Sequence, residues 1–161
     1  MVGTEFNTAG TGVFKEIRFN DNNNTVLIST DTNLPTFDDN STIIGGLAGG
    51  LGSGTYNTIL GQTAGYRING SQNTFIGSFA GSKSTFSQTR EKSTAVGYNA
   101  LAMGLNNVNG ADYFSVLGYE AGYAASGTRS VGVGYKSLYF ALGDDNIEIV
   151  NDGTNLSLIH I

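Results

Sequence analysis

One phrase occurs six times in this chain and strongly limits how the chain can fold. Each copy holds a small or β-branched residue, two mostly apolar residues, a central glycine, two variable residues, a small residue and then Gly or Leu. The copies are TIIGGLAG from Thr42, TILGQTAG from Thr58, TFIGSFAG from Thr74, TAVGYNAL from Thr94, SVLGYEAG from Ser115 and VGVGYKSL from Val131. The successive central glycines, Gly45, Gly61, Gly77, Gly97, Gly118 and Gly134, lie 16, 16, 20, 21 and 16 residues apart. A short, nearly constant period predicts a β-solenoid that stacks one small unit, with loops inserted after the third and fourth copies.

The residue types within each copy predict the shape of one coil. The apolar pair and the preceding Thr or Ser favour a short strand, because β-branched residues suit extended backbone. The central glycine indicates a turn or a close approach between backbones, and the Ala-Gly or Ala-Leu pair is expected to begin a second short strand. We therefore predict an all-β fold, a parallel β-solenoid (β-roll) of about six 16-residue coils.

The repeats divide the chain into three segments. Residues 1–40 precede the array and contain KEIRF and TVLIS on either side of an asparagine-rich stretch, so we expect an N-terminal β-hairpin that serves as an adaptor. Residues 41–143 form the solenoid repeat array. Residues 144–161 contain NIEIV and NLSLIHI on either side of an Asp-Gly turn, so they are expected to form a C-terminal β-hairpin cap.

Charge and composition exclude several classes of partner. Charged residues make up 13% of the chain, the net charge is -5, and cysteine is absent. No disulfide framework or thiolate metal site can form, and the clustered Lys and Arg that bind nucleic acid or an anionic membrane are missing. No segment approaches the apolar length of a membrane span, and the start MVGTEFNTAG has no signal peptide features. We expect no nucleic acid, no membrane insertion and no cofactor.

The two apolar positions before each central glycine point to opposite faces of a strand. The nearer position holds Ile44, Leu60, Ile76, Val96, Leu117 and Val133. The farther position holds Ile43, Ile59, Phe75, Ala95, Val116 and Gly132. One set can fill the interior of the coil, while the other would face water in a single chain, which implies a partner surface.

A further column of small residues comprises Ala48, Ala64, Ala80, Ala100, Ala121 and Ser137. Small side chains suit the close approach of chains around an axis. A rotational ring buries the same strip on every copy without leaving an open contact, so we predict a homotrimer.

With six copies in register, residues 41–143 resemble the repeats of phage and phage-like tail fibres and of the heads of trimeric autotransporter adhesins. The left-handed parallel β-roll of those heads carries a Ser/Asn-x-apolar-Gly phrase. The resemblance implies a homotrimeric, extracellular or virion-associated fibre that attaches to a glycan or protein receptor on a cell surface and assembles with other fibre or baseplate chains. The steps of 20 and 21 residues are longer than in a regular roll, and no coiled-coil stalk or membrane anchor is visible. These departures favour the tail fibre.

Tyrosines and two inserted loops are the candidate receptor contacts. Tyr98, Tyr119 and Tyr135 directly follow the central glycine of their copies, and Tyr66, Tyr123 and Tyr139 stand five residues after it. Aromatic faces stack on sugar rings and phenol hydroxyls hydrogen-bond to them. The alternative is that these rings cover the coil or pack between subunits. The loops, which often lie on the binding side of a repeat array, contribute Lys83, Arg90, Asn106, Asn107, Asn109 and Asp112.

Other motifs are better explained by structure than by chemistry. The glycine-rich run from Gly45 to Thr55 lacks the strand, helix and Lys-Ser/Thr context of a phosphate loop. The oxygen clusters at 38–40 and 144–146 lack the spacing of calcium loops and are interpreted as turns. His160 is the lone histidine, and a zinc site would need three copies of it near a symmetry axis, so we interpret it as a strand-surface residue. No nucleophile motif is present, so we predict no enzyme activity and no metal.

Two other functions fit parts of the sequence. The chain can be a purely structural shaft or spacer of a fibre, with recognition carried elsewhere. It can also be an ice-binding solenoid, because Thr42, Thr58, Thr74 and Thr94 align in one column. This column is single, flanked by apolar residues and expected to be interrupted by the insertions, so the attachment fibre is the preferred interpretation.

Overall fold

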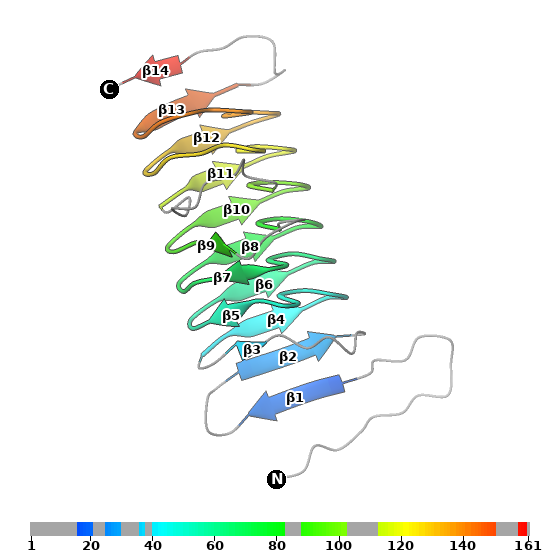
Figure 1. Ribbon diagram of the computed structural model, residues 1–161. Coiled ribbons are helices and arrows are strands. Elements are labelled where there is room, and N and C mark those ends of the chain that lie inside the picture. Colours follow the sequence, from blue (N-terminus) through cyan, green and yellow to red (C-terminus); the bar gives the residue numbers. More distant parts are fainter. Residues whose placement is uncertain are drawn as a thin grey trace.

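The computed structural model describes residues 16–20, 25–29, 36–37, 40–82, 88–102, 113–150 and 158–160 of the chain. In these ranges every regular element is a β-strand. The chain winds into a tall parallel β-solenoid of about six turns (Figure 1). The prediction of an all-β solenoid is confirmed.

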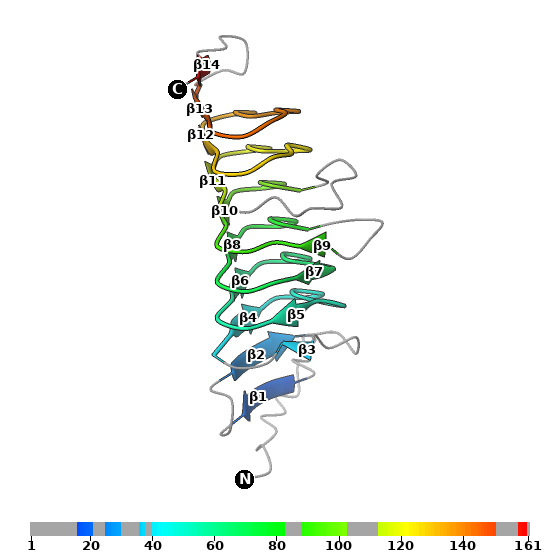
Figure 2. The same ribbon diagram turned by 60° about the vertical axis from the view of Figure 1, so that its left-hand side comes forward.

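A large and a small sheet form two sides of the solenoid (Figure 2). The large sheet contains, in order, β1 (Glu16–Asn20), β2 (Thr25–Ser29), β4 (Thr42–Ile44), β6 (Thr58–Leu60), β8 (Thr74–Ile76), β10 (Thr94–Val96), β11 (Ser115–Leu117), β12 (Val131–Val133), β13 (Asn146–Ile149) and β14 (Leu158–His160). The small sheet contains β3 (Thr36–Phe37), β5 (Ser53–Gly54), β7 (Ile68–Asn69) and β9 (Gln88–Thr89). Neighbouring strands run parallel from β2 to β13, whereas β1 and β14 pair antiparallel with β2 and β13.

The parallel ladder extends past both ends of the repeat array. Leu27 of β2 pairs with Ile43, and Ile147 of β13 pairs with Val131. Residues assigned from sequence to the terminal segments therefore supply the first and last parallel rungs. The turns expected within the two terminal hairpins, at 21–24 and 151–157, lie outside the described residues.

The longer repeats keep the register of the sheet. Thr74 pairs with Thr94 across a step of 20 residues, and Thr94 pairs with Ser115 across a step of 21. The threonine column (Thr42, Thr58, Thr74 and Thr94) therefore continues from strand to strand. The expectation that the insertions interrupt this column is wrong.

The Ala-Gly pair does not begin a strand, contrary to the prediction. It lies in an arc of turns in which every second residue is left-handed, as shown by Thr63, Gly65 and Arg67 with φ of 59°, 59° and 60°. This alternation turns every second N–H toward a neighbouring coil. The N–H of Thr63 donates to the carbonyl of Gly46 in the coil before, and that of Gly65 to the carbonyl of Ala80 in the coil after, both at 2.8 Å. The arc thus satisfies its backbone groups without extended structure, and the second strands, β5, β7 and β9, come later.

The interior is filled by the farther of the two apolar positions. Ile43, Ile59, Phe75, Ala95 and Val116 are each at most 2% exposed. The small-residue column of Ala48, Ala64, Ala80, Ala100, Ala121 and Ser137 is at most 1% exposed, and its alanines belong to the same core cluster. The prediction that this column lies between chains is wrong, because each coil encloses its own member of the column.

Side-chain size is balanced within each coil. In the coil of β8, a Cβ on Gly81 would lie 2.6 Å from Cγ of Phe75, so the large strand residue requires a glycine opposite. In the coil of β12 the arrangement is reversed, because a Cβ on Gly132 would lie 3.0 Å from Cγ of Leu138. The large and the small residue of a coil therefore exchange places, because a narrow, closely packed interior has no room for two large side chains at these positions.

The central glycines are required by contact between backbones. Gly97 has a φ of 135°, and a Cβ there would lie 2.2 Å from the carbonyl oxygen of Gly118 in the next coil. Only a residue without a side chain can meet both conditions. The spacing of the coils is thus encoded directly by the most regular feature of the sequence.

A buried polar ladder links the coils beside the starts of most strands of the large sheet and is interrupted by Phe114 before β11. Its members are at most 6% exposed and comprise Ser41, Asn57, Asn73, Ser93, Ser130 and Asn146. The N–H of Asn73 donates to Oδ1 of Asn57 at 3.0 Å, and the N–H of Ser93 donates to Oδ1 of Asn73 at 3.1 Å. Because these side-chain oxygens accept from the next coil, the polar groups are buried without losing their hydrogen bonds.

Glu148 completes the last coil with a side chain instead of a backbone carbonyl. In the coil of β11, the N–H of Gly122 donates to the carbonyl of Ser137 in the following coil at 2.7 Å. The corresponding N–H of Leu138 donates to a carboxylate oxygen of Glu148 at 2.6 Å. Glu148 is only 4% exposed, so this acidic residue closes the C-terminal end of the hydrogen-bond ladder.

Candidate functional site

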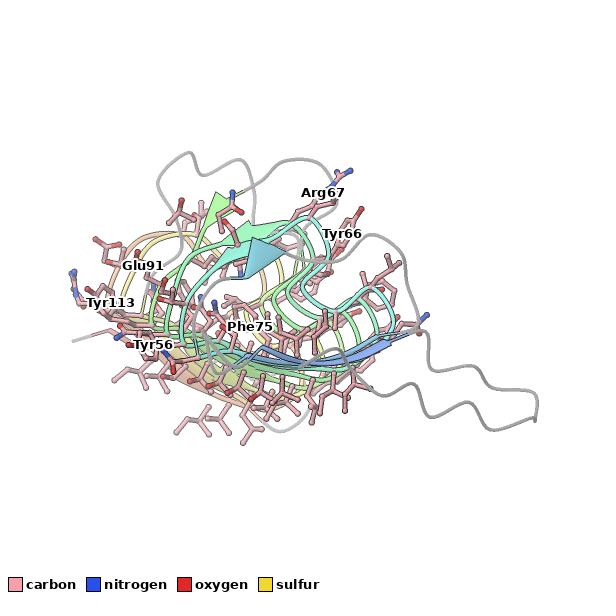
Figure 3. The ribbon with its side chains drawn as sticks, turned by 90° about the horizontal axis from the view of Figure 1, so that it is seen from below. Tyr56, Tyr66, Arg67, Phe75, Glu91 and Tyr113 are labelled. Carbon is pink, nitrogen blue, oxygen red and sulfur yellow. The ribbon has the colours of Figure 1, made fainter. Side chains whose placement is uncertain are left out.

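The outer face of the large sheet carries the apolar set that the interior does not use. We name Ile44, Leu60, Ile76, Val96, Leu117, Val133 and Ile149 the aliphatic stripe. Leu60, Leu117 and Ile149 are 37%, 52% and 63% exposed. Figure 3, a view along the solenoid, shows side chains projecting from the sheet on the side away from Phe75. The stripe and the threonine column beside it contain no charged residue, which is unusual for a face that stays in water.

Three tyrosines stack on one another along the C-terminal half of the solenoid. The ring centroids of Tyr98 and Tyr119 lie 5.4 Å apart with planes at 15°, and those of Tyr119 and Tyr135 lie 5.4 Å apart at 13°. We call these residues the tyrosine ladder. The rings are 43% to 45% exposed. The ladder forms because each ring directly follows a central glycine and strands stack about 4.8 Å apart, so neighbouring rings partly cover each other's faces.

A second stack consists of Tyr123 and Tyr139, whose ring centroids lie 5.1 Å apart with planes at 13°. Tyr66 has the same repeat position in an earlier coil, but Ser82 and Ala102 hold this position in the two coils between. Five of the six predicted tyrosines thus lie in two stacks. The sequence predicted the columns, whereas the contact between rings appears only in the structure.

Tyr66 stands apart in the N-terminal half. The guanidinium carbon of Arg67 lies 5.2 Å from the centroid of its ring (Figure 3). This is a cation–π contact between two neighbouring residues. Tyr66 therefore remains a candidate contact residue on a different part of the surface from the two stacks.

Lys136 and Glu120 lie beside both stacks, and sequence reasoning missed them. The Nζ of Lys136 is 3.5 Å from a carboxylate oxygen of Glu120, and 5.3 Å and 5.1 Å from the ring centroids of Tyr135 and Tyr139. Burial lowers the pKa of Lys136, but hydrogen bonding to Tyr135 and the charge of Glu120 outweigh burial and raise it. A sequence signal existed, because both residues stand two positions after a central glycine in consecutive 16-residue coils.

The same surroundings favour the neutral form of two tyrosines. Repulsion from the Glu120 carboxylate, followed by burial, raises the pKa of Tyr119 above its usual value. Burial, followed by the neighbouring Tyr139, raises the pKa of Tyr123. Both phenols are protonated at neutral pH and can donate as well as accept a hydrogen bond.

The predicted loop contacts are only partly described. Lys83, Asn106, Asn107, Asn109 and Asp112 lie outside the described residues. Arg90 is described and is 0% exposed, with its guanidinium donating to the carbonyl of Leu101. The prediction that Arg90 contacts a receptor is wrong, because its side chain is fully buried in the single chain.

The remaining polar candidates have partners within the chain. Asp144 accepts from the N–H of Thr128 at 2.7 Å, and Asp145 accepts from two guanidinium nitrogens of Arg129 at 2.7 Å and 2.8 Å. Among the described residues no group of three His, Cys, Asp or Glu is placed to hold a metal ion. Asp38, Asp39 and the side chain of His160 lie outside the described part of the chain.

Two surfaces are therefore candidates for function. One is the aliphatic stripe, and the other is the tyrosine surface, which we define as the tyrosine ladder with Tyr123, Tyr139, Glu120 and Lys136. No helix in the described ranges is long and apolar enough to cross a membrane. In comparisons with known proteins, no family model, no curated protein and no solved structure matches this chain.

Proposed function

We propose that this chain is a segment of a homotrimeric attachment fibre, as in a phage tail fibre, that binds a glycan or protein on a cell surface. The observation that carries this proposal is the aliphatic stripe, whose members are exposed or half-buried in the single chain and recur along the large sheet. The resemblance of the repeat phrases to those of trimeric fibres and adhesin heads supports it. Such a fibre works outside the cell or on a virion.

Burial of the stripe provides the driving force for association. Its residues span six steps between β4 and β13, or about 29 Å at a strand spacing of about 4.8 Å. Full burial of an aliphatic side chain contributes about 1.5 to 3 kcal/mol, while association costs about 4 to 15 kcal/mol in lost freedom. Since these side chains begin only partly exposed, many must be covered at once, which a continuous stripe allows.

A closed ring of identical chains covers the stripe on every copy. The stripe runs parallel to the solenoid axis, so three chains can pack side by side with their large sheets facing a common axis. An open arrangement would leave an uncovered stripe on its outermost chains and promote further aggregation. Three-fold closure therefore suits an elongated shape that must remain soluble.

Light scattering after size-exclusion chromatography tests the assembly. We expect the wild-type mass to be three times that of the 16.8 kDa chain, and the double variant Leu60→Glu/Leu117→Glu to elute as a folded monomer with unchanged circular dichroism. Leu142→Glu is the matched control, because Leu142 is 70% exposed and lies outside the stripe. A stable wild-type monomer would remove the basis of the proposal.

We assign receptor contacts to the loops at 82–92 and 103–113, with the buried Arg90 left out, and to the tyrosines. Shortening both loops is expected to leave the trimer intact and to abolish binding of labelled protein to whole cells. The shortening is confined to 83–87 and 103–112, so it spares β9 (Gln88–Thr89) and the buried Arg90. Because the large sheet keeps its register across both insertions, we expect its strands to remain paired. Unchanged cell binding by the loopless trimer would contradict the assignment to the loops.

A second candidate, a purely structural shaft, is favoured by the packing of the tyrosines on one another. Rings that cover each other's faces stabilise the stack of coils without any ligand. A shaft predicts the same trimer but no binding of this segment to cells or to glycans. The two candidates are thus separated by cell binding and not by mass.

A further inference from the structure

The tyrosine ladder presents a regular row of polar groups at the spacing of the coils. The 5.4 Å between its ring centroids exceeds the roughly 3.5 to 4.0 Å at which carbon atoms touch, so the rings are offset and overlap only in part. Each ring is 43% to 45% exposed. Each tyrosine therefore leaves part of its ring accessible, and the accessible parts repeat once per coil.

Hydrogen-bonding groups lie between this row and a second one. Tyr123 and Tyr139 repeat at 5.1 Å, and the ammonium group of Lys136 lies within 5.3 Å of ring centroids in both stacks. Lys136 and Glu120 form an ion pair at 3.5 Å, so their charges cancel within the surface. With a net charge of -5 on the chain, a polyanionic ligand would be repelled. The surface therefore suits an uncharged, polar and repetitive ligand.

We infer that the tyrosine surface binds a linear, uncharged, β-linked polysaccharide of the cellulose or chitin type, lying along the solenoid axis. This inference rests on the proposed attachment function and names the class of its receptor. The equatorial linkages of such polymers hold the sugar rings in an extended ribbon, and one ring follows another at nearly the distance between coils. Successive sugars can therefore meet successive tyrosines, with alternate sugars presenting the same face.

The residues of the surface match the groups that such a ribbon offers. The phenol hydroxyls both donate to and accept from sugar hydroxyls, and the accessible parts of the rings pack on sugar C–H groups. Lys136 and Glu120 contribute a donor and an acceptor between the two stacks. An α-linked polymer such as amylose winds into a helix, so it cannot keep successive sugars in step with the coils.

Isothermal titration calorimetry on the assembled wild-type protein tests this inference with three probes of equal length, cellohexaose, chitohexaose and maltohexaose. We expect binding of at least one β-linked oligomer and none of maltohexaose. Tyr119→Phe keeps the stacked ring and removes one hydroxyl, so binding should weaken about five- to tenfold, the equivalent of one hydrogen bond. Tyr119→Ala should abolish binding, whereas Tyr56→Ala, at an exposed tyrosine outside the surface, should leave it unchanged.

Several results would overturn the inference. These are failure of both β-linked oligomers to bind, equal binding of maltohexaose, or full binding by Tyr119→Ala with wild-type mass and circular dichroism. Whole-cell binding by the same samples separates this inference from the proposed function. If the wild-type protein binds cells but neither β-linked oligomer, the ligand class is refuted and the proposed attachment function is not. If the wild-type trimer binds neither the oligomers nor cells, the proposed attachment function is contradicted too.

Discussion

The coils of β4, β6 and β8 and the coils of β10, β11 and β12 share one backbone but distribute their side chains differently. In the first group a large residue on the strand faces a glycine, as Phe75 faces Gly81. In two coils of the second group the sizes are reversed, as in Gly132 and Leu138. The backbone repeat therefore depends on glycines and inter-coil hydrogen bonds, while the interior allows the large residue to stand at either of two facing positions.

The outward-facing position that follows each central glycine differs even more between the two halves. The position after the central glycine holds Gly46, Gln62 and Ser78 in the first three coils, and Tyr98, Tyr119 and Tyr135 in the next three. Because the side chain at this position points out of the coil, the coil accepts small or polar residues there in one half and tyrosines in the other. A common scaffold thus carries a specialised surface on its C-terminal half.

The largest effect is expected where the two halves are identical, at the central glycines. Gly61→Ala and Gly97→Ala would each place a Cβ within 2.6 Å of a carbonyl oxygen in the next coil, at a φ of 133° and 135°. We expect each change to lower the free energy of unfolding by about 3 to 5 kcal/mol, from backbone strain and overpacking together. Urea denaturation followed by circular dichroism measures the loss.

Gly143→Ala is the control for this prediction. Gly143 also has a positive φ, 88°, but a Cβ there meets nothing within 4 Å. It should cost only about 1 to 2 kcal/mol from backbone conformation. If Gly61→Ala and Gly97→Ala are no more harmful than Gly143→Ala, contact between coils is not the reason for the glycines. If only one of them is harmful, the two halves do not share one backbone rule.

An intermediate effect is expected where the halves differ in their interior. Leu138→Gly should destabilise by about 2 to 5 kcal/mol because it opens a cavity, and Gly132→Val by about 1 to 3 kcal/mol because it overpacks. The double variant copies the Val116 and Gly122 pair of the preceding coil. We expect it to recover a coupling energy of about 1 to 3 kcal/mol in a double-mutant cycle. Strictly additive losses would show that the side chains at positions 132 and 138 do not compensate for each other.

The smallest effect is expected on the pKa of Tyr119, which belongs to the stacked tyrosines of the C-terminal half. Glu120 raises the pKa of Tyr119 above its ordinary 10.0 in the folded state, so the neutral phenol is favoured by folding. The associated stability is complete below about pH 10 and is lost as the pH rises through the raised pKa. Titration of phenolate absorbance, assigned with Tyr119→Phe, should show that Glu120→Gln lowers the pKa of Tyr119. An unchanged titration would mean that the Glu120 carboxylate does not face this hydroxyl in solution.

Much of the fold could be predicted from the sequence because repetition is visible without any structure. The strands at 42–44 and 58–60, the parallel register and the two opposite faces all follow from the spacing of glycines and β-branched residues. The candidate site was predicted less completely. Tyrosine columns follow from the period, but the stacking of rings and the ion pair of Lys136 with Glu120 depend on how side chains of different coils meet.

Two predictions failed for a shared reason. The small-residue column that includes Ala80 was assigned to a contact between chains, and Arg90 was assigned to the surface, yet both are fully buried. Small size fits an axis between chains as well as a thin coil, and a charge in a loop usually faces water. To decide between such alternatives one must know which face of the strands each coil encloses.

The amino-acid sequence by itself determined the period, the strands and the existence of two apolar faces, because these depend on the order of residues along the chain. The tertiary structure decided which face became the interior, where the arc bends and which rings touch. Those outcomes depend on the direction in which each coil closes, and coil closure is set by left-handed turns and by hydrogen bonds to neighbouring coils. No single repeat contains that information, since each coil is completed by the one that follows it.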